Sequence, residues 1–462
     1  MPTNTSAASF LSSPLRTFFS LWLPVLFSLI AEPVTGLVDT AFVARLGTAS
    51  MAALGVGTMV LSSVFWIFNF LGVGSQTEVS QALGRQQMAR GVRISSLALI
   101  LALGAGSVLT LLAWFFASPV ATAMGASAEF HQQATSYIQW RTAGAPAVLL
   151  TLTTFGVLYG LQDMRMPLWI AVSVNAMNIL LDWVLIFGPG PLPAFGITGA
   201  AAASAISQWI GAGWAVSRVY RQLGFTIHIQ GKDIRRLLTV GADMFIRTGM
   251  LTLFLLFATR AATRLGPEAG AAHQAIRQVW VFTALFLDAA AITAQSLIGW
   301  FVGSDRIADA RKVAGFVCLW SLLLGAMLAT GMLAGRQHFA ALLVPLPAMA
   351  LFYPAWSVAA LFQPIGALAF ATDGIHWGTG DYRYLRNVVT LSTACGVLGI
   401  WLLGEETPEL LTGIWWISGI WLSIRACFGL LRIWPAIGKS PLRLPSKGVD
   451  FFAAFFCVQA LF

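Results

Sequence analysis

The sequence of 462 residues has little charge, because only 10% of its residues are Asp, Glu, Lys or Arg while 58% are hydrophobic. An ordinary soluble domain carries roughly 25% charged residues. A water-soluble fold of this composition would lack the polar groups to cover its surface. Apolar stretches of about 20 residues recur along the chain, and a helix of that length crosses the roughly 30 Å hydrocarbon layer of a bilayer. The composition therefore predicts an integral membrane protein whose main surrounding is the lipid bilayer.

Cysteine, histidine and catalytic motifs are also scarce. The four cysteines lie in the second half without a CxxC or other ligand spacing, and the five histidines are isolated in sequence. These patterns argue against a disulfide framework and a metal site. The chain contains no HExxH zinc helix, no GxSxG elbow and no GxxxxGK[ST] phosphate loop. We therefore expect no enzymatic activity, no cofactor and no metal. Without a nucleotide site, transport would have to draw on an ion gradient.

Basic residues outnumber acidic residues by 27 to 18, but they are scattered through short connections and form no stripe. We therefore expect no nucleic-acid partner. Nineteen Lys and Arg residues fall in one set of alternate connections, and only Arg45, Arg264 and Arg336 fall in the opposite set. Basic residues are retained on the cytoplasmic side of a membrane. This distribution predicts an even number of spans and places both termini in the cytoplasm.

Apolar runs separated by Gly, Pro or charged residues predict an all-α protein of about twelve transmembrane helices. The alternation typical of transmembrane strands is absent. The predicted spans lie near residues 18–44, 51–77, 94–117, 135–160, 168–187, 197–222, 240–265, 272–302, 313–334, 350–376, 386–403 and 409–432.

The longest basic connection lies between the sixth and seventh spans and suggests two six-helix lobes. The predicted organisation is a cytoplasmic segment 1–17, a first lobe 18–222, a linker 223–239, a second lobe 240–434 and a cytoplasmic tail 435–462. The tail fits either an interfacial helix or a segment without fixed structure. An ungapped shift of 219 residues, which we call the repeat shift, lays Arg45-Leu46-Gly47 on Arg264-Leu265-Gly266. This favours a parallel six-helix repeat, an architecture that places a substrate cavity between its halves.

The fifth span reads VNAMNILLDW and puts Asn175, Asn178 and Asp182 on one helical face. An ionisable side chain in hydrocarbon costs several kcal/mol unless it faces a cavity or a partner, so acids within spans are functional candidates. Two amides beside a carboxylate can donate hydrogen bonds to it and hold a water molecule or an ion. A polar cluster that only packs helices together is the alternative interpretation.

The first span contains Pro24 and Pro33, and each proline removes a backbone hydrogen bond and can bend or break the helix. Glu32 and Asp39 are seven positions apart and lie on nearly the same face, where crowded carboxylates disfavour double ionisation. We expect Asp39 and Asp182 to carry a coupling proton jointly. Asn178 would orient Asp182 by hydrogen bonding, and Glu32 would add a second titrating group.

The second lobe differs from the first, because the repeat shift places Ala258 opposite Asp39 and Trp401 opposite Asp182. The first lobe is therefore expected to be the main cation-linked lobe. Asp243 and Arg247, at i and i+4, fit an ordinary structural ion pair as well as a transport role. Glu78, near the end of the second span, is expected to be solvated. The secondary cavity candidates are Asp288, Gln295, Asp373, Asp243 and Arg247.

Over about residues 21–432 the chain resembles the multidrug and toxic compound extrusion (MATE) family, in its DinF-like branch. Six motifs in order carry the resemblance: LP at 23–24, GLVDTAF at 36–42, GLQDMRMP at 160–167, NAMNILLDW at 175–183, DMFIRT at 243–248 and QPIGALAFATDGI at 363–375. The resemblance implies two six-helix lobes in a V, alternating access, and export of amphipathic cations or other small organic compounds in exchange for protons or sodium ions.

The resemblance also implies a cation-linked site at Asp39, Asn178 and Asp182 and a bendable first helix at Pro24. Glu32 departs from the family pattern, which usually has an uncharged residue there. We expect a monomer in the inner (plasma) membrane. A flippase for a lipid-linked precursor is the alternative function, and its support consists of the basic residues in or near spans: Arg141, Arg260, Arg277 and Arg425.

Overall fold

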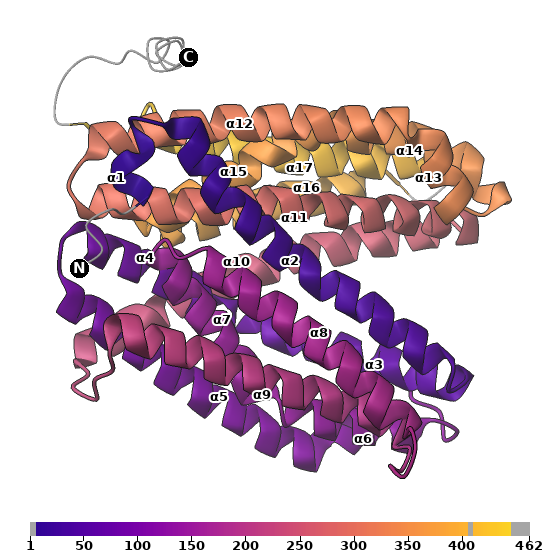
Figure 1. Cartoon of the computed structure of the whole chain (residues 1–462). Helices are drawn as coiled ribbons and strands as arrows, with labels where there is room; N and C mark the ends of the chain where they lie inside the picture. The colour runs from indigo at the N-terminus through magenta and orange to yellow at the C-terminus, as the bar shows by residue number, and fades with distance from the viewer. Residues whose placement is uncertain (1–5, 405–409, 445–462) are drawn as a thin grey trace. The chain divides into compact units, whose positions relative to one another are not determined.

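The computed structural model describes residues 6–404 and 410–444, and the regular structure in these ranges is helical (Figure 1). The helices are α1 (Ser6–Phe10), α2 (Pro14–Ala44), α3 (Thr48–Ile67), α4 (Asn69–Gly84), α5 (Met88–Ala123), α6 (His131–Thr142), α7 (Ala145–Gly160), α8 (Arg165–Phe187), α9 (Gly196–Leu223), α10 (Gly231–Arg264), α11 (Pro267–Gly303), α12 (Ile307–Ala334), α13 (Arg336–Leu343), the 3₁₀ turn η1 (Leu346–Ala348), α14 (Met349–Leu361), α15 (Gln363–Thr379), α16 (Tyr382–Leu402) and α17 (Leu410–Ile433).

Each of the twelve predicted spans falls on one helix or on two consecutive helices. Among the described residues, nine helical segments are long and apolar enough to cross a membrane. Two further segments are bent pairs, α6 with α7 at 45° and η1–α14 with α15 at 44°. The remaining long helix, α9, is rich in Gly, Ala and Ser and falls short of the same apolar character. The prediction of an all-α, multi-pass membrane protein is confirmed.

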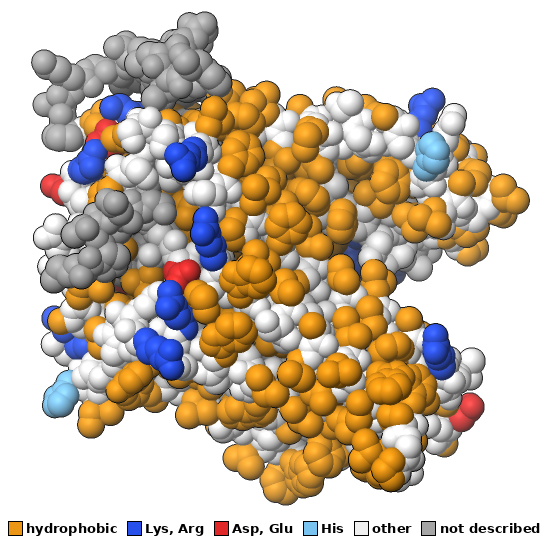
Figure 2. All heavy atoms as spheres, in the orientation of Figure 1, with side chains coloured by type: hydrophobic (Ala, Val, Ile, Leu, Met, Phe, Trp, Pro, Cys, Tyr) orange, Lys and Arg blue, Asp and Glu red, His pale blue; other side chains and the backbone are white. Residues whose placement is uncertain are grey.

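The outer surfaces of the helices are strongly apolar. Figure 2 shows hydrophobic side chains over much of the visible face of the molecule. On α5, the consecutive side chains of Trp114, Phe115 and Phe116 are 55% to 73% exposed. Exposed aromatic side chains in such density suit contact with lipid, because water would disfavour them.

The chain forms two compact units, which we call the N-lobe (residues 19–241) and the C-lobe (residues 6–18 and 242–444). The predicted linker 223–239 is helical from Gly231, where α10 begins. Part of the predicted cytoplasmic segment 1–17 packs in the C-lobe, because the ring of Phe10 meets the ring of Phe316 edge-on with centroids 5.3 Å apart. Of the predicted tail, residues 445–462 lie outside the described residues.

Backbone angles repeat between the two lobes at positions that the repeat shift pairs. Gly47, before α3, has φ 104° and ψ 176°, and Gly266, before α11, has φ 117° and ψ 169°. Only glycine adopts such angles without strain. Gln87, before α5, has φ −98° and ψ 62°, and Arg306, before α12, has φ −98° and ψ 61°. The structure therefore contains the parallel repeat that the sequence shift predicts.

Close helix crossings also repeat between the two lobes. In the N-lobe α4 packs on α7, and a Cβ atom at Gly156 would meet the backbone of Gly72. In the C-lobe α11 packs on α15, and a Cβ atom at Gly374 would meet the backbone of Ala291. Small residues let helix backbones approach closely in membrane proteins. Both lobes therefore have one tightly packed central helix pair built from equivalent positions.

The expectation that Glu78 is solvated is wrong. Glu78 is 4% exposed at the end of α4 and pairs with Arg90 at 2.8 Å and with Arg236 at 2.5 Å. Its neighbours Ser75, Gln76 and Thr77 are buried too. A buried carboxylate needs a charged or hydrogen-bonding partner, and basic residues of α5 and α10 supply it here.

Candidate functional site

The polar face of α8 is the centre of the N-lobe site. Buried residues recur every fourth position along this helix: Ile170, Val174, Asn178, Asp182 and Ile186. This spacing keeps them on the face that packs against α9. Asp182 is 0% exposed and Asn178 is 4% exposed, while Asn175 is half-buried. The predicted stripe therefore exists, with its carboxylate at the most buried point.

Asn178 does not orient Asp182 as the sequence spacing predicts. Its amide nitrogen Nδ2 donates to Ser204 Oγ of α9 at 3.4 Å. Neither carboxylate oxygen of Asp182 accepts a hydrogen bond from a donor within the described residues. Ser204 was not visible as a partner in the sequence, because the α8–α9 contact that brings it near Asn178 is tertiary. Asn178 therefore ties α8 to α9 and leaves the acid available for other partners.

Asp182 instead interacts with Asp39 of α2. The two carboxyl groups lie within hydrogen-bonding reach of each other, and Oδ1 of Asp39 is also buried without a donor in the described chain. An ionised carboxylate can only accept hydrogen bonds, so two of them share a hydrogen bond only when one carries a proton. The structure therefore brings together the two acids that the sequence predicts to act jointly, in an arrangement that has a natural place for one proton.

Arg141 of α6 lies close enough to act electrostatically on both acids. It is half-buried, and its Nη1 atom has no hydrogen-bond partner among the described residues. Tyr137, one turn earlier, lies within hydrogen-bonding reach of Thr58 and near the same charges. With one shared proton, the two acids and Arg141 carry no net charge. Loss of that proton leaves a net charge of −1 in a buried place.

The set of side chains suits a proton better than a metal ion. No group of three or more His, Cys, Asp or Glu residues that could hold a metal occurs in the described part of the chain. Divalent cations in proteins usually need several oxygen ligands, and an adjacent guanidinium would repel them. A proton shared by the two acids would give their buried oxygens a hydrogen bond.

The first long helix carries Asp39 but does not bring Glu32 into the pair. Helix α2 runs without interruption through Pro24 and Pro33, so neither proline breaks it in this structure. Glu32 is exposed and lies about 10 Å from Asp39 along the helix axis, at 1.5 Å per residue. Ser28 Oγ, one turn after Pro24, lies 3.3 Å from Tyr159 Oη of α7. The functional role of Glu32 stays a prediction.

The C-lobe candidates form a separate buried charge cluster. Asp373 of α15 accepts hydrogen bonds from Arg247 of α10 and from Arg425 of α17, the latter at 2.7 Å. All three side chains are 7% exposed or less. Asp288 of α11 is half-buried and feels the charges of this cluster. Gln295, further along α11, is fully buried.

The i, i+4 ion pair considered for Asp243 and Arg247 is not present. Asp243 pairs with Arg386 of α16 at 2.5 Å, and Arg247 pairs with Asp373. Both partners come from other helices. A side chain in a membrane helix bundle reaches whichever opposite charge the neighbouring helix presents, and sequence spacing along one helix cannot reveal that choice.

Sequence reasoning missed Arg141 as a member of the acid site. Its position near a span was visible, but it was counted only among basic residues that would support a flippase. Its proximity to Asp39 and Asp182 depends on contacts of α6 with α3 and α9. An arginine in an apolar span is by itself a signal that an acid lies near, because an unpaired buried charge is costly.

Comparison with known proteins gives matches over most of the chain. A profile of the MatE family matches residues 24–184 and 244–402. DNA damage-inducible protein F of Escherichia coli is 27% identical over 439 residues, which cover 92% of this chain and 93% of that protein. A probable multidrug resistance protein NorM of Deinococcus radiodurans is 28% identical over 63% of this chain and 65% of its own length.

Plant relatives match over a shorter part of their length. Protein DETOXIFICATION 42 of Arabidopsis thaliana is 30% identical over 305 residues, 65% of this chain. The chain spans 57% to 64% of the length of the four Arabidopsis relatives that it matches.

Two solved structures share the fold. One, "Crystal structure of MATE in the bent conformation", aligns with a TM-score of 0.85 and 19% identity over 93% of this chain and 96% of that chain. The other, a MOP superfamily transporter from Pyrococcus furiosus, aligns with a TM-score of 0.83 and 19% identity over 96% of this chain and 100% of that chain. At this level of identity the likeness concerns the fold.

Proposed function

This chain belongs to the MatE family of membrane transporters, and from that premise we propose that it is an antiporter that exports small organic compounds in exchange for protons. The proposal includes a monomer in the plasma membrane with both termini in the cytoplasm. Members of the family are transporters and carry no enzymatic activity. The coupling ion is the part that the following observations support.

The observation that carries the proposal is the Asp39–Asp182 pair beside Arg141, in which Asp182 is buried and Asp39 is half-buried. Two acids within hydrogen-bonding reach, with three of their oxygens lacking a donor in the described chain, form a place where one proton removes one net charge. A proton-coupled transporter needs a group that binds and releases a proton during its cycle. Acids that meet at a site shielded from water are typical of such groups.

Coupling to conformation follows from where the two acids are attached. Asp39 belongs to α2 and Asp182 to α8, so movement of α2 relative to α8 changes the distance between the carboxyl groups and therefore the proton affinity. Thermodynamic linkage then requires that proton binding shifts the position of α2 in return. Pro24 and Pro33 remove backbone hydrogen bonds within α2 and make such a movement less costly. Proton entry from outside would thus reset the transporter after substrate release.

The proton is favoured over sodium by the same geometry. Sodium binding to the acid pair would require both carboxylates to be ionised and would place a metal cation near the guanidinium of Arg141. A proton shared by the pair leaves the site neutral without that repulsion. Arg141 therefore supports proton coupling as the finer assignment.

The test is compound efflux from proteoliposomes that contain the purified protein, loaded with members of a panel of drug-like compounds. An inward-directed proton gradient should accelerate efflux of at least one compound, and a protonophore should abolish the acceleration. An inward-directed sodium gradient at constant pH should have no effect. Efflux that follows the sodium gradient and ignores the protonophore would contradict proton coupling.

The flippase alternative gains no specific support from the positions of its basic residues. Arg425 is neutralised by Asp373, and Arg141 lies beside the acid pair. Arg260 is exposed, and neither it nor Arg277 forms an ion pair with an acid in the described chain. A lipid headgroup would need several basic residues free of acidic partners at one place, and Arg141 and Arg425 each lie beside an acid.

A further inference from the structure

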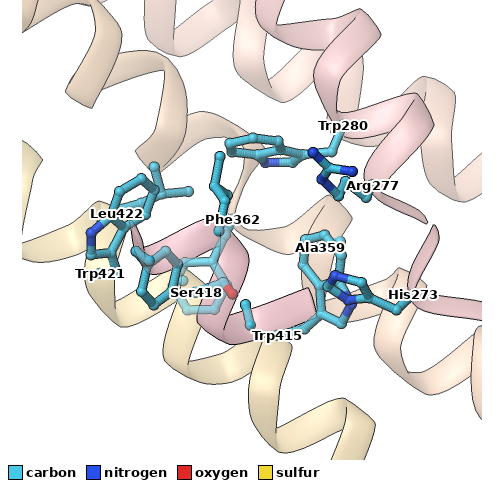
Figure 3. Close-up of a pocket in the computed structure, with 13 residues that line it drawn as sticks. His273, Arg277, Trp280, Ala359, Phe362, Trp415, Ser418, Trp421 and Leu422 are labelled. Carbon is cyan, nitrogen blue, oxygen red and sulfur yellow. The ribbon is translucent and has the colours of Figure 1, made fainter. Parts of the chain in front are cut away.

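The C-lobe contains a partly open pocket between α10, α11, α14 and α17 (Figure 3). Its empty space, including the open mouth, is about 480 Å³. Among the described residues that line it none is acidic, and Arg277 is the one with a formal charge. In Figure 3 the guanidinium of Arg277 lies beside the indole of Trp280, and His273 lies beside Trp415. Five aromatic side chains supply most of the wall: Phe254, Trp280, Phe362, Trp415 and Trp421.

The lobe repeat gives this pocket a counterpart in the N-lobe. The repeat shift pairs positions in the first two long helices of each lobe, as the backbone angles at Gly47 and Gly266 demonstrate. It also pairs Gly106 with Gly325. A Cβ atom at Gly106 would meet the backbone of Pro146, and a Cβ atom at Gly325 would meet the backbone of Pro364. Pro146 and Pro364 are therefore equivalent. The bent helix pairs that contain these prolines, α6–α7 and α14–α15, are thus related by a shift that is one residue shorter than the repeat shift. Equivalent residues can therefore be read across the lobes.

Three residues of the acid site correspond to three residues that line the pocket. The repeat shift pairs Asp39 with Ala258 and Thr58 with Arg277. In the register of the bent helix pairs, Arg141 corresponds to Ala359. At these positions the C-lobe has alanine in place of Asp39, arginine in place of Thr58 and alanine in place of Arg141. The C-lobe pocket therefore has one guanidinium but no carboxylate at these three positions.

Two buried polar atoms of the pocket, on Arg277 and His273, lack a partner among the described residues. The Nε atom of Arg277 is buried and unpaired in the described chain, and its Nη1 atom is 3.5 Å from Gln274 Oε1, at the limit for a hydrogen bond. His273 is 4% exposed. Thr259 Oγ1 donates to Leu255 O at 2.8 Å, so it can only accept from His273 Nε2, 3.3 Å away. In neutral His273 the proton therefore sits on Nε2, and Nδ1 is a buried acceptor without a donor in the described residues.

We propose that this pocket binds an aromatic carboxylate whose ring carries a hydroxyl group meta to the carboxylate. The carboxylate accepts charge-assisted hydrogen bonds from Arg277, and the hydroxyl group donates to Nδ1 of His273. The flat ring packs against the indole and phenyl walls. His273 and Arg277 are at i and i+4 on α11, so their Cβ atoms are about 6 Å apart. This separation suits a carboxylate and a hydroxyl group that are meta to each other on one ring. The charge of Arg277 would repel an organic cation, and no acid among the described lining residues would offset that repulsion.

An aromatic hydroxycarboxylate bound in this pocket would be a substrate for export, and this role rests on the proposed function. Binding itself needs no ion gradient. Calorimetric titration of the purified full-length protein in detergent therefore tests it directly, with 4-hydroxy-2-naphthoate as the probe. The comparison ligands are 2-naphthoate, which lacks the hydroxyl group, and naphthalen-2-ylmethylammonium, which carries the opposite charge.

Wild-type protein should bind 4-hydroxy-2-naphthoate at least tenfold more tightly than the ammonium compound. Arg277→Gln should weaken hydroxynaphthoate binding about tenfold or more, as expected for the loss of a charge-assisted hydrogen bond. Arg260→Gln, which removes an exposed arginine of the same lobe, is the matched control and should leave binding unchanged. His273→Phe should keep 2-naphthoate binding and lose the preference for the hydroxylated ligand. Where Arg277→Gln does not fold, Arg277→Lys should give a smaller loss of affinity.

The proposal is overturned if the wild-type protein binds no hydroxynaphthoate, if the ammonium compound binds as tightly, or if folded Arg277→Gln binds like the wild type. These outcomes are separable from the fate of the proposed function. Proton-driven export of other compounds without naphthoate binding counts against this inference alone. Naphthoate binding without any proton-driven export counts against the antiport mechanism alone.

Discussion

Replacement of Asp373 by Asn should destabilise the C-lobe severely, because it removes the one acid that two buried arginines share. Arg247 and Arg425 both hydrogen-bond Asp373, and the three side chains are 3% to 7% exposed. Each guanidinium also lies over an aromatic ring, with Arg247 4.9 Å from the centroid of Trp377 and Arg425 4.7 Å from that of Trp421. These ring contacts hold both cations in place after the acid is gone, so each charge stays buried without the acid that it hydrogen-bonds, and Asp288 acts on them only through space.

The expected loss follows from the cost of breaking a buried ion pair by removing one partner, about 3–5 kcal/mol. Asp243→Asn is the matched control, because the side chain of its partner Arg386 is 24% exposed and can reach solvent. A partly exposed pair contributes about 1 kcal/mol or less. The triple replacement Asp373→Leu, Arg247→Met and Arg425→Met removes all three charges together. It should recover most of the loss, since apolar residues of similar size often replace a buried ion cluster without net cost.

The assay is thermal unfolding of the purified protein in detergent, followed by intrinsic tryptophan fluorescence. The unfolding midpoint should fall far more for Asp373→Asn than for Asp243→Asn, and the triple variant should lie near the wild type. Equal midpoints for Asp373→Asn and the wild type would refute the reasoning. They would also return Asp373 to the group of residues whose role is in transport rather than in stability.

Three further predictions concern the N-lobe and the topology. Glu32→Gln should shift the pH dependence of export without abolishing it, and an unchanged pH profile would remove Glu32 from the coupling mechanism. In a cysteine-free background, an impermeant thiol reagent added outside intact cells should label a cysteine at Ala128 and not one at Gln230, and labelling of Gln230 alone would reverse the orientation. Gly156→Ala should lower the free energy of unfolding by about 1–3 kcal/mol, because its methyl group would meet the backbone of Gly72. Gly104→Ala is the control and should leave the free energy of unfolding unchanged, because Gly104 has open space around it. Equal effects of the two substitutions would argue against the close α4–α7 crossing.

The helical spans were predictable because each needs only an apolar run of sufficient length, which is a local property of the sequence. The breaks within spans were not. Helix α3 ends at Ile67 and α4 begins at Asn69, although no proline or charge marks the junction. The 45° bend between α6 and α7, by contrast, has a local mark, because Pro146 lies in the first turn of α7. The buried polar stretch of α4, including Glu78, was missed because its arginine partners come from other helices.

The acid site was predictable in its members and not in its contacts. Asp39 and Asp182 stand out because acids are rare in apolar spans, and their joint role was a prediction before their proximity was known. Arg141 and Ser204 join the site through tertiary packing of α6 and α9, which no spacing within one helix reveals. The same limit explains why the ion pair expected between Asp243 and Arg247 is absent and why each residue pairs with another helix. The correspondence of Asp39 with Ala258 was readable from the repeat, but the pocket around Ala258 was not.

Proton-driven export by Asp39→Asn, Asp182→Asn and the double variant tests the central claim most directly. Asparagine keeps the shape of aspartate and supplies a permanent donor to the remaining acid, so each single variant should fold and resemble the protonated site. Each should lose gradient-driven export in proteoliposomes, and the double variant should be little worse, because the two acids act as a unit. Glu129→Gln, at an exposed acid of the same lobe, should export at the wild-type rate. Export by Asp182→Asn at the wild-type rate under a proton gradient would contradict the account.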